Sequence, residues 1–282
     1  MRLPITIILL ALLSIPVSAQ KTVYELEDSI RIEEILYRSI NGSTSATGER
    51  LIAIANEFID EKYVAGTLEQ GIEEPLFISC TKLDCTTFVE LVLAIAKTAD
   101  EGSSRFSDVC RNLETIRYRN GKNSGYSSRL HYISWWITDK AKNGIIAEMT
   151  SQISNEKQLV NLNFMSTHPG SYPLLKENPD MVKEIEMQEL PYRDVEVNYM
   201  PKDDISATGC DNIKAGDIVA ITTSVPGLDV THIGFAHYHN GQLCLLHASS
   251  GKGKVIKETQ PLRNYLENNK RHTGIRVVRA QF

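Results

Sequence analysis

Cys85 lies at the start of a predicted helix, where a thiol can act as a nucleophile. Asp84 precedes it and is a suitable N-cap residue. The unpaired N–H groups and the positive end of a helix dipole favour a thiolate, so we expect the pKa of Cys85 to be lowered. The neighbouring Asp84 carboxylate opposes this, but less so where it turns inward to cap the helix. A small buried core cysteine is the competing interpretation, because free cysteine is among the most buried residue types. The helix is predicted by apolar residues at three- and four-residue spacing, which are Phe88, Val89, Val92, Ile95, Ala96 and Ala99.

Several histidines lie in a predicted β-hairpin over residues 229–250. Asn240-Gly241 separates two strand-like runs, and this pair favours a two-residue type I′ turn. That turn fixes the register, so that Gly234 faces His247. His232 and His247 are then diagonal neighbours on one face of the sheet, and Gly234 leaves room between them. By the same parity the other face carries His237, His239 and Cys244.

Cys85, His232 and His247 are the residue types of a cysteine hydrolase. In such enzymes one imidazole accepts the thiol proton and a polar third group fixes its tautomer. We expect His232 to be the base and His247 its orienter. Two ordinary strand histidines are the alternative, which their shared face and the presence of Cys85 disfavour. The residues 237–239 resemble a His-x-His metal pair, but they lack a nearby carboxylate or cysteine with ligand spacing, and we expect their face to contact solvent. No metal or other cofactor is therefore expected.

Three segments together resemble the catalytic blocks of the NlpC-type cell-wall cysteine hydrolases, which are papain-like. They are Asp84-Cys85-Thr86-Thr87-Phe88, Thr231-His232-Ile233-Gly234 and Leu246-His247-Ala248-Ser249. The resemblance extends from about residue 49 to the end. Further stretches narrow it to the N-acetylmuramoyl-L-alanine amidase-like branch, and these are Tyr118-Arg119, Ser128-Arg129-Leu130-His131-Tyr132, Ser134-Trp135-Trp136, Met165-Ser166, His168-Pro169 and Gly216-Asp217-Ile218-Val219-Ala220.

The resemblance implies a papain-like core and a set of substrate contacts. Thr86-Thr87 follows the cysteine, where the commoner peptidase members carry Ser-Gly, and the insert before the histidine block is long. The usual dipeptide specificity is therefore in doubt. From spacing alone, residues 129–132 and the tryptophans after them fit a charged helix start followed by core aromatics slightly better than a binding site. The residues that the resemblance implies as substrate contacts are Tyr63, Glu69, Asp84, Arg129, His131 and Tyr132.

The N-terminus has the pattern of a signal peptide over residues 1–19. A basic Arg2 precedes an apolar core over residues 5–15, and Val17-Ser18-Ala19 is a small-residue cleavage site. The apolar stretch is shorter than the roughly 20 residues that a membrane-spanning helix needs. We therefore expect an exported, periplasmic protein without stable membrane insertion after cleavage.

Composition limits the other possible partners. The 282 residues include 35 Asp and Glu against 30 Lys and Arg, which gives no basic footprint for nucleic acid. Five cysteines are too few and too scattered for a disulfide scaffold, and an odd number fits one free thiol. Whether any of the others pair is left open. His272 is expected at the surface, and the protein is expected to be a monomer.

Predicted helices come first along the chain and predicted strands later, which is typical of the α+β class. We expect an N-terminal helical extension and linker over residues 20–48 and one papain-like domain over 49–282. Within it, 102–201 is expected to be an insertion that selects the substrate. The predicted helices cover 24–40, 49–60, a segment from Cys85, 106–119, 130–142 and 262–268, and the predicted strands cover 145–153, 195–200, 217–223, the hairpin and 273–280.

The function predicted from these features is hydrolysis of the amide between N-acetylmuramic acid and L-alanine in peptidoglycan fragments (muropeptides). The sugar can be the ordinary or the 1,6-anhydro form. One alternative is a γ-D-glutamyl-diamino acid endopeptidase, the commoner activity of these hydrolases. A second is a cell-wall binding module without catalysis, which has no need for a cysteine and two histidines on one face.

Overall fold

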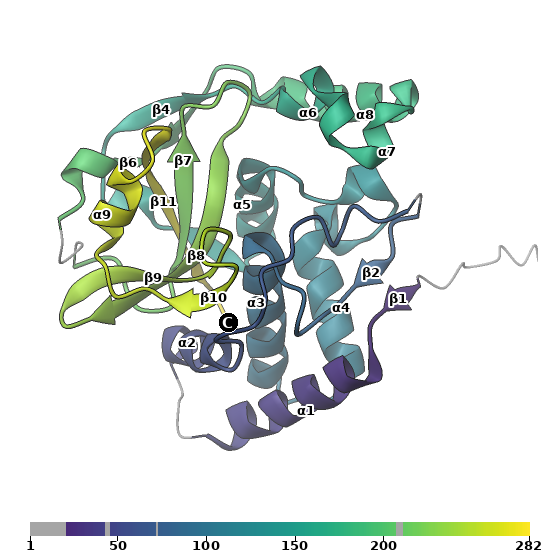
Figure 1. The fold of residues 1–282 in the computed structure, drawn as a ribbon, viewed down its shortest axis with the longest axis vertical. Helices are drawn as coiled ribbons and strands as arrows, with labels where there is room; N and C mark the ends of the chain where they lie inside the picture. The colour runs from purple at the N-terminus through teal and green to yellow at the C-terminus, as the bar shows by residue number, and fades with distance from the viewer. Residues whose placement is uncertain (1–20, 43–45, 72, 207–210) are drawn as a thin grey trace, which may run out of the picture.

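The structure is a computed structural model that describes residues 21–42, 46–71, 73–206 and 211–282. Its centre is a seven-stranded sheet with the order β10-β9-β8-β7-β11-β3, in which β6 also pairs with β11 (Figure 1). Neighbouring strands in this sheet run antiparallel. The strands are β3 (Ile146–Glu148), β6 (Met200–Pro201), β7 (Ile218–Thr223), β8 (Val230–His239), β9 (Gln242–Ser249), β10 (Lys254–Lys257) and β11 (His272–Ala280).

A layer of helices covers one face of the sheet, with α3 (Cys85–Asp100) at its centre (Figure 1). Phe88 on α3 meets Phe235 on β8 edge to face, with ring centroids 5.8 Å apart. Nearly every side chain of α3 beyond its first turn is buried, because other helices surround it. These are α1 (Leu26–Asn41), α2 (Thr47–Asn56), α4 (Phe106–Arg117) and α5 (Ile133–Lys142).

The opposite face of the sheet is also covered. Ile218 and Ala220 of β7 belong to the core on the helical side, whereas Val219 and Ile221 belong to a second core. The short helix α9 (Leu262–Glu267) closes that second core. Both faces of the central strands are therefore apolar, which explains why β7 reads as a continuous run of hydrophobic residues rather than an alternating one.

Three short helices form a lobe beside α5 (Figure 1), namely α6 (Phe164–Thr167), α7 (Pro173–Lys176) and α8 (Pro179–Glu189). Tyr132 ties this lobe to the core, because its hydroxyl donates to Glu189 Oε1 at 2.7 Å and accepts from the Met165 N–H at 2.8 Å. Two small sheets complete the fold, one of β1 (Thr22–Val23) with β2 (Leu76–Phe77) in parallel, the other of β4 (Lys157–Val160) with β5 (Val195–Asn198) antiparallel.

The predicted helices and strands are present, with differences at their ends and in the middle of the chain. The strand predicted over 145–153 ends at Glu148 and continues as a 3₁₀ turn. The sequence pattern missed β10 and the lobe α6–α8. Helices and an antiparallel sheet agree with the expected mixed composition. The predicted signal peptide over 1–19 lies outside the described residues.

The predicted division of the chain at 20–48 and 102–201 stays a prediction, and both segments pack against the rest of the fold. Helix α1 packs on α3, and so does α4. Strand β3 joins the main sheet beside β11. The expectation that 102–201 selects the substrate stays a prediction, and of this stretch it is the lobe and the loop before α5 that lie near the cavity described below. In the part of the chain that the structure describes, no helix is both long and apolar enough to cross a membrane.

Candidate active site

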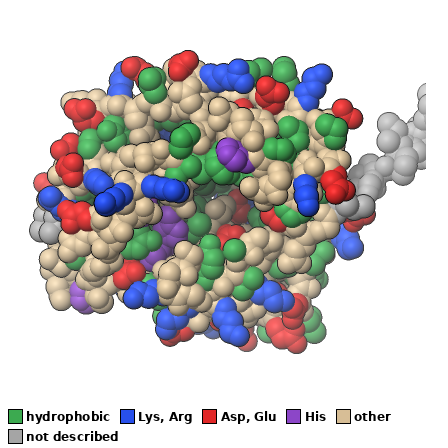
Figure 2. Space-filling model, turned by 45° about the horizontal axis from the view of Figure 1, so that its top comes forward, with side chains coloured by type: hydrophobic (Ala, Val, Ile, Leu, Met, Phe, Trp, Pro, Cys, Tyr) green, Lys and Arg blue, Asp and Glu red, His purple; other side chains and the backbone are tan. Residues whose placement is uncertain are grey.

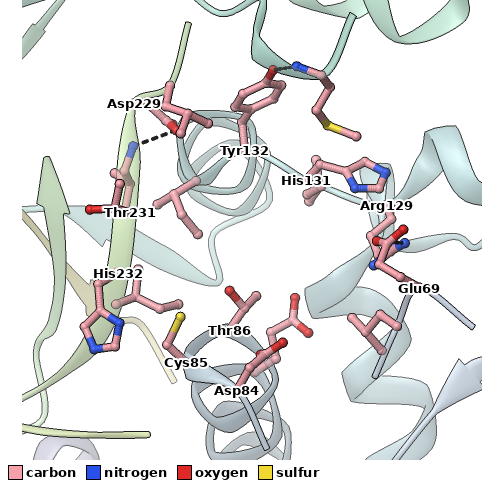
Figure 3. A pocket seen from close by; sticks show the side chains of 18 of the residues that line it. Glu69, Asp84, Cys85, Thr86, Arg129, His131, Tyr132, Asp229, Thr231 and His232 are labelled. Carbon is pink, nitrogen blue, oxygen red and sulfur yellow. Dashed lines mark hydrogen bonds and ion pairs between the residues drawn. The ribbon is translucent and has the colours of Figure 1, made fainter. Parts of the chain in front are cut away.

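A cavity of about 290 Å³ opens at the N-terminus of α3. Figure 2 shows the hollow in the molecular surface, with acidic side chains at depth and histidine on its left side. Figure 3 shows how the walls are divided among the chain segments. The start of α3 supplies Asp84, Cys85 and Thr86, the start of β8 supplies Thr231 and His232, and the far wall carries Glu69, Arg129 and His131.

The helix start is fixed by a reciprocal capping box. The Asp84 carboxylate accepts the Thr87 N–H at 2.8 Å, and the Thr87 hydroxyl accepts the Asp84 N–H at 2.9 Å. Two otherwise unsatisfied donors are thereby paired. The predicted N-cap role of Asp84 is confirmed, and the box holds Cys85 as the first helical residue.

The prediction of a lowered pKa at Cys85 is wrong. Burial, and after it the charge of Asp84, raise the pKa of the thiol to about 11. Hydrogen bonds from the Ile233 backbone and from Thr86 act in the opposite direction but are outweighed. At this helix start the desolvation of a partly buried sulfur and the negative charge of the capping residue outweigh the effect of the helix dipole. Cys85 is therefore a protonated thiol at rest.

The predicted hairpin register is confirmed. His237 pairs with Cys244 and His239 with Gln242, as the two-residue turn requires. A Cβ on Gly234 would lie 2.8 Å from the Cβ of His247, so only glycine leaves room for the imidazole that reaches across.

Within this register the two histidines bond to each other. His232 Nε2 lies 2.5 Å from His247 Nδ1. The two rings meet edge to face, with centroids 4.7 Å apart. Because Nε2 of His232 is engaged, its Nδ1 is the nitrogen left for the Cys85 thiol, which lies on the same side of the cavity (Figure 3).

Both imidazoles are neutral at neutral pH. Burial, assisted by His247 and His272, lowers the pKa of His232 to about 3. Burial also lowers the pKa of His247 to about 4. A neutral imidazole can accept a proton, so the protonation states of the thiol and of His232 are those that general-base catalysis requires.

Glu258 extends the chain of contacts beyond His247, and the sequence pattern did not single it out. Its Oε1 lies 3.5 Å from His247 Nε2. The Glu258 carboxylate lies near His247 because β10 pairs with β9. This pairing sets Ile256 opposite His247, and Glu258 follows two residues later. The available signal for this third strand was the β-branched pair Val255-Ile256 just after Gly253.

Two rings cover the histidine pair. Tyr265 on α9 lies 5.3 Å from the His247 ring and stacks on His272 at 6.1 Å between centroids. His272 is 7% exposed, so its expected place at the surface is wrong. It is buried because α9 folds over the start of β11, a packing that cannot be derived from the local sequence.

On the far wall Arg129 is neutralised by carboxylates. Its guanidinium contacts Glu69 Oε1 at 2.8 Å and Glu74 Oε1 at 3.0 Å, and it lies over the Tyr126 ring. Tyr126 also donates to Glu69 Oε2 at 3.2 Å. Arg129 and Glu69 thus form a rigid, paired wall rather than a free cation and a free anion.

The other predicted substrate contacts lie at or near the cavity. His131 and Tyr132 line it. Burial and Arg129 lower the pKa of His131 well below its usual value, so it is a neutral ring, held by a 2.9 Å contact to the Tyr126 carbonyl oxygen. The hydroxyl of Tyr132 is hydrogen-bonded to Glu189 and Met165 in the lobe, so the edge of the Tyr132 ring is the part that faces the cavity. Tyr63 lies outside the lining residues, where it forms a β-bridge with Leu83 just before α3. Burial, and after it the charges of Cys85 and Asp84, raise its pKa to about 12.

The face of the hairpin that bears His237 is not a solvent face as expected. His237 is 2% exposed, and its Nε2 lies 2.9 Å from the Glu258 carbonyl oxygen. In the described part of the chain no three histidine, cysteine, aspartate or glutamate side chains are grouped as metal ligands. Cys80, Cys85, Cys110 and Cys244 are free thiols there, while Cys210 lies outside the described residues.

Asp229 is a lining residue that the sequence analysis did not select. It is buried, accepts the Ser134 N–H at 2.5 Å at the start of α5, and accepts its neighbour Val230 N–H at 2.8 Å. It therefore couples the first residue of β8 to the first turn of α5, and so sets the distance between the histidine wall and the far wall.

Comparison with known proteins decides the family. The AmiA-like model, described as N-acetylmuramoyl-L-alanine amidase-like, matches residues 53–275. This chain belongs to the N-acetylmuramoyl-L-alanine amidase-like family. It is thus an amidase-like hydrolase of a peptidoglycan-related family. No curated protein matches the chain.

Solved structures agree with that placement. An N-acetylmuramoyl-L-alanine amidase from Bacteroides uniformis is 41% identical with a TM-score of 0.81, covering 84% of this chain and 99% of its own. A Bacteroides fragilis protein that carries a provisional xylanase name is 46% identical with a TM-score of 0.78, covering 80% and 99%. A Legionella pneumophila protein, 23% identical with a TM-score of 0.68 over 91% and 95% of the two chains, shares the fold.

Proposed function

We propose that this amidase-like protein is an exported, cysteine-dependent N-acetylmuramoyl-L-alanine amidase with an NlpC-type papain-like core. The observation that carries the proposal is the relay at one wall of the cavity, where Cys85 lies beside His232 and His232 Nε2 lies 2.5 Å from His247. A half-buried thiol, a neutral imidazole and a third group that fixes the imidazole are the parts of a cysteine hydrolase.

In the first step Cys85 Sγ attacks the carbonyl carbon of the amide between the lactyl group of muramic acid and L-alanine. The thiol proton passes to His232 Nδ1, so the thiolate forms during attack rather than before it. As the C–N bond breaks, His232 returns the proton to the leaving amine. The N–H of Cys85, which as the first helical residue has no intrahelical acceptor, is available to the oxyanion.

In the second step water attacks the muramoyl thioester. His232 takes a proton from the water and returns one to the departing sulfur, which releases the muramic acid carboxyl group. His247 and Glu258 hold the orientation of His232 throughout and stabilise the imidazolium that forms transiently. The part of the cavity that holds the substrate is shaped by Glu69, Asp84, Arg129, His131 and Tyr132, and Tyr63 lies beside Leu83 just before α3.

A carbohydrate-cleaving role, as the name of the Bacteroides fragilis protein suggests for that protein, fits these side chains less well. Glycoside hydrolysis requires two carboxyl groups free to act as acid and as base or nucleophile. Four carboxylates line the cavity. Asp84 caps α3, and Glu90 is bonded to Arg117 at 2.7 Å. Glu69 is paired with Arg129, and Asp229 accepts two backbone N–H groups. All four are already engaged by the protein.

The proposal is tested by digesting defined muropeptides, with ordinary and 1,6-anhydro muramic acid, and weighing the products. An amidase releases a peptide-free sugar and a peptide that begins with L-alanine. Products cut between D-glutamate and the diamino acid would instead establish the endopeptidase, and binding without any cleavage would establish a wall-binding module. The predicted signal peptide over 1–19 is tested separately, by sequencing the N-terminus of the secreted protein.

A further inference from the structure

A second hollow, of about 500 Å³, adjoins the Cys85 cavity on the other side of His232. The two share Thr231 and His232 as a common wall. In the described part of the chain, Cys85 lines the first cavity and lies outside the lining of the second. The other walls of the second hollow come from the loop after β9, from Glu258 and from α9 with the loop that follows α9.

The chemistry of acyl transfer assigns different halves of a substrate to the two spaces. The acyl half becomes bonded to Cys85 Sγ and must occupy the space that Cys85 lines. The amine half receives its proton from His232, and so must leave on the side of the imidazole. The second hollow is bordered by that imidazole, so it lies where the amine half emerges.

The charges that line the two spaces also favour placing the amine half of the substrate in the second hollow. The Cys85 cavity is lined by the carboxylates of Glu69, Asp84, Glu90 and Asp229, and its one lining guanidinium, Arg129, is already paired with two carboxylates. A substrate carboxylate is therefore disfavoured there. The second hollow has one lining carboxylate, Glu258, against the exposed ammonium of Lys252, and its other polar lining groups are hydroxyls, amides and imidazoles.

Lys252 and Glu258 both belong to the lining of this hollow. Burial raises the pKa of Glu258, and the Lys252 charge opposes that rise. The backbone N–H of Lys252 donates to Ser249 Oγ, which holds the loop against the end of β9. Asn268 and Asn269 line the same hollow after α9, so amide groups, one cation and one carboxylate border the space.

We propose that this second hollow binds the leaving stem peptide, and that Lys252 pairs with the α-carboxylate of its D-glutamyl residue. The inference rests on the proposed amidase function. In a γ-linked stem the glutamyl α-carboxylate is free, and it lies one residue beyond the L-alanine amine that His232 protonates. An ammonium at that side of the imidazole supplies the counter-charge.

The test uses two muropeptides that differ only at this group, one with the glutamyl α-carboxylate and one with the α-carboxamide. Wild-type protein is expected to have a kcat/KM about 3- to 10-fold higher on the carboxylate form, the range of one partly exposed charge-assisted hydrogen bond. Lys252→Met is expected to lower kcat/KM more on the carboxylate form than on the carboxamide form, so that the preference disappears. Lys257→Met is the matched control, because Lys257 is an exposed lysine near His237 on the opposite face, and it should keep the preference.

Equal wild-type rates on the two substrates would overturn the inference and leave the amidase intact. A preference that survives in Lys252→Met, or an equal loss on both substrates, would do the same. If wild-type protein releases no peptide-free sugar from either substrate, the amidase itself falls and the inference with it. The products thus report on the function, and the ratio of rates reports on Lys252.

Discussion

The two faces of the β8–β9 hairpin carry similar residues with different surroundings. One face bears His232 and His247, the other His237 and Cys244, and all four side chains are buried. On the first face the imidazole of His232 reaches the start of α3 and a cavity. On the second face His237 contacts a backbone oxygen, and Cys244 is enclosed by the core. Residue type and burial are therefore common to both faces, and only the junction with Cys85 makes one of them suitable for chemistry.

The largest difference in kcat is expected between the alanine variants of the two cysteines, Cys85 and Cys244. Cys85→Ala removes the nucleophile and is expected to lower kcat by at least about 10³-fold. Cys244→Ala, its matched control, removes one buried sulfur, so it should lower the free energy of unfolding by about 1 kcal/mol and change kcat less than about twofold. Steady-state rates on a muropeptide and urea unfolding measure both. A Cys85→Ala protein with wild-type turnover would eliminate the mechanism.

The glutamine variants of His232 and His237 should differ in kcat in the same way. His232→Gln removes the proton acceptor and is expected to lower kcat about 10²- to 10⁴-fold, the usual contribution of a general base. His237→Gln loses one hydrogen bond to the Glu258 carbonyl, which should cost about 1 kcal/mol of stability with little change in rate. Comparable losses of rate in both variants would mean that the two faces are not functionally distinct.

A smaller effect is expected at Glu258, which acts through His247 as a positioning residue. A carboxylate near an imidazole favours its protonated form. Glu258→Gln should therefore lower kcat about 3- to 10-fold and move the acid limb of the kcat/KM profile to lower pH. A merely structural role would lower the rate without moving that limb. The full pH profile of the variant distinguishes the two.

The smallest difference concerns acid stability, where both faces should behave alike. Burial lowers the pKa values of His232 and His247 to about 3 and about 4. Above about pH 6.5 these imidazoles are neutral in both the folded and the unfolded chain, so their contribution is fully present. As the pH falls from about 6.5 towards 3 the unfolded chain binds protons first, and stability drops by up to about 1.4 kcal/mol per pH unit for each group.

His237 lies on the other face, and its pKa is also lowered, to about 4, mainly by burial. Urea unfolding of wild-type protein between pH 7 and pH 4, compared with His232→Gln and His237→Gln, checks this. Both variants should lose stability less steeply than wild type. An unchanged slope in both would show that these histidines are not buried as neutral rings.

The register of the site was predictable because it depends on a short-range signal. Asn240-Gly241 sets the turn, and parity then places His232 and His247 together without knowledge of the rest of the fold. The helix from Cys85 was predictable from its apolar spacing, and the AmiA-like match supports the amidase-like family to which the sequence pointed.

The errors arose where distant segments meet. The pKa of Cys85 depends on burial beneath β8, and the exposure of His237 and His272 depends on the helical layer and on α9. Glu258 reaches His247 only because β10 adds a third strand to the hairpin. None of these contacts is encoded within the segment that bears the residue, so periodicity and motif spacing could not reveal them.

The most direct test of the central claim is the mass of the covalent intermediate. Protein mixed with a muropeptide and quenched in acid within one turnover should carry a muramoyl group, without stem peptide, on the peptide fragment that contains Cys85. The same mass should be absent from the fragment that contains Cys244 and from the Cys85→Ala protein. A muramoyl group on another residue, or an adduct that retains the stem peptide, would contradict the account.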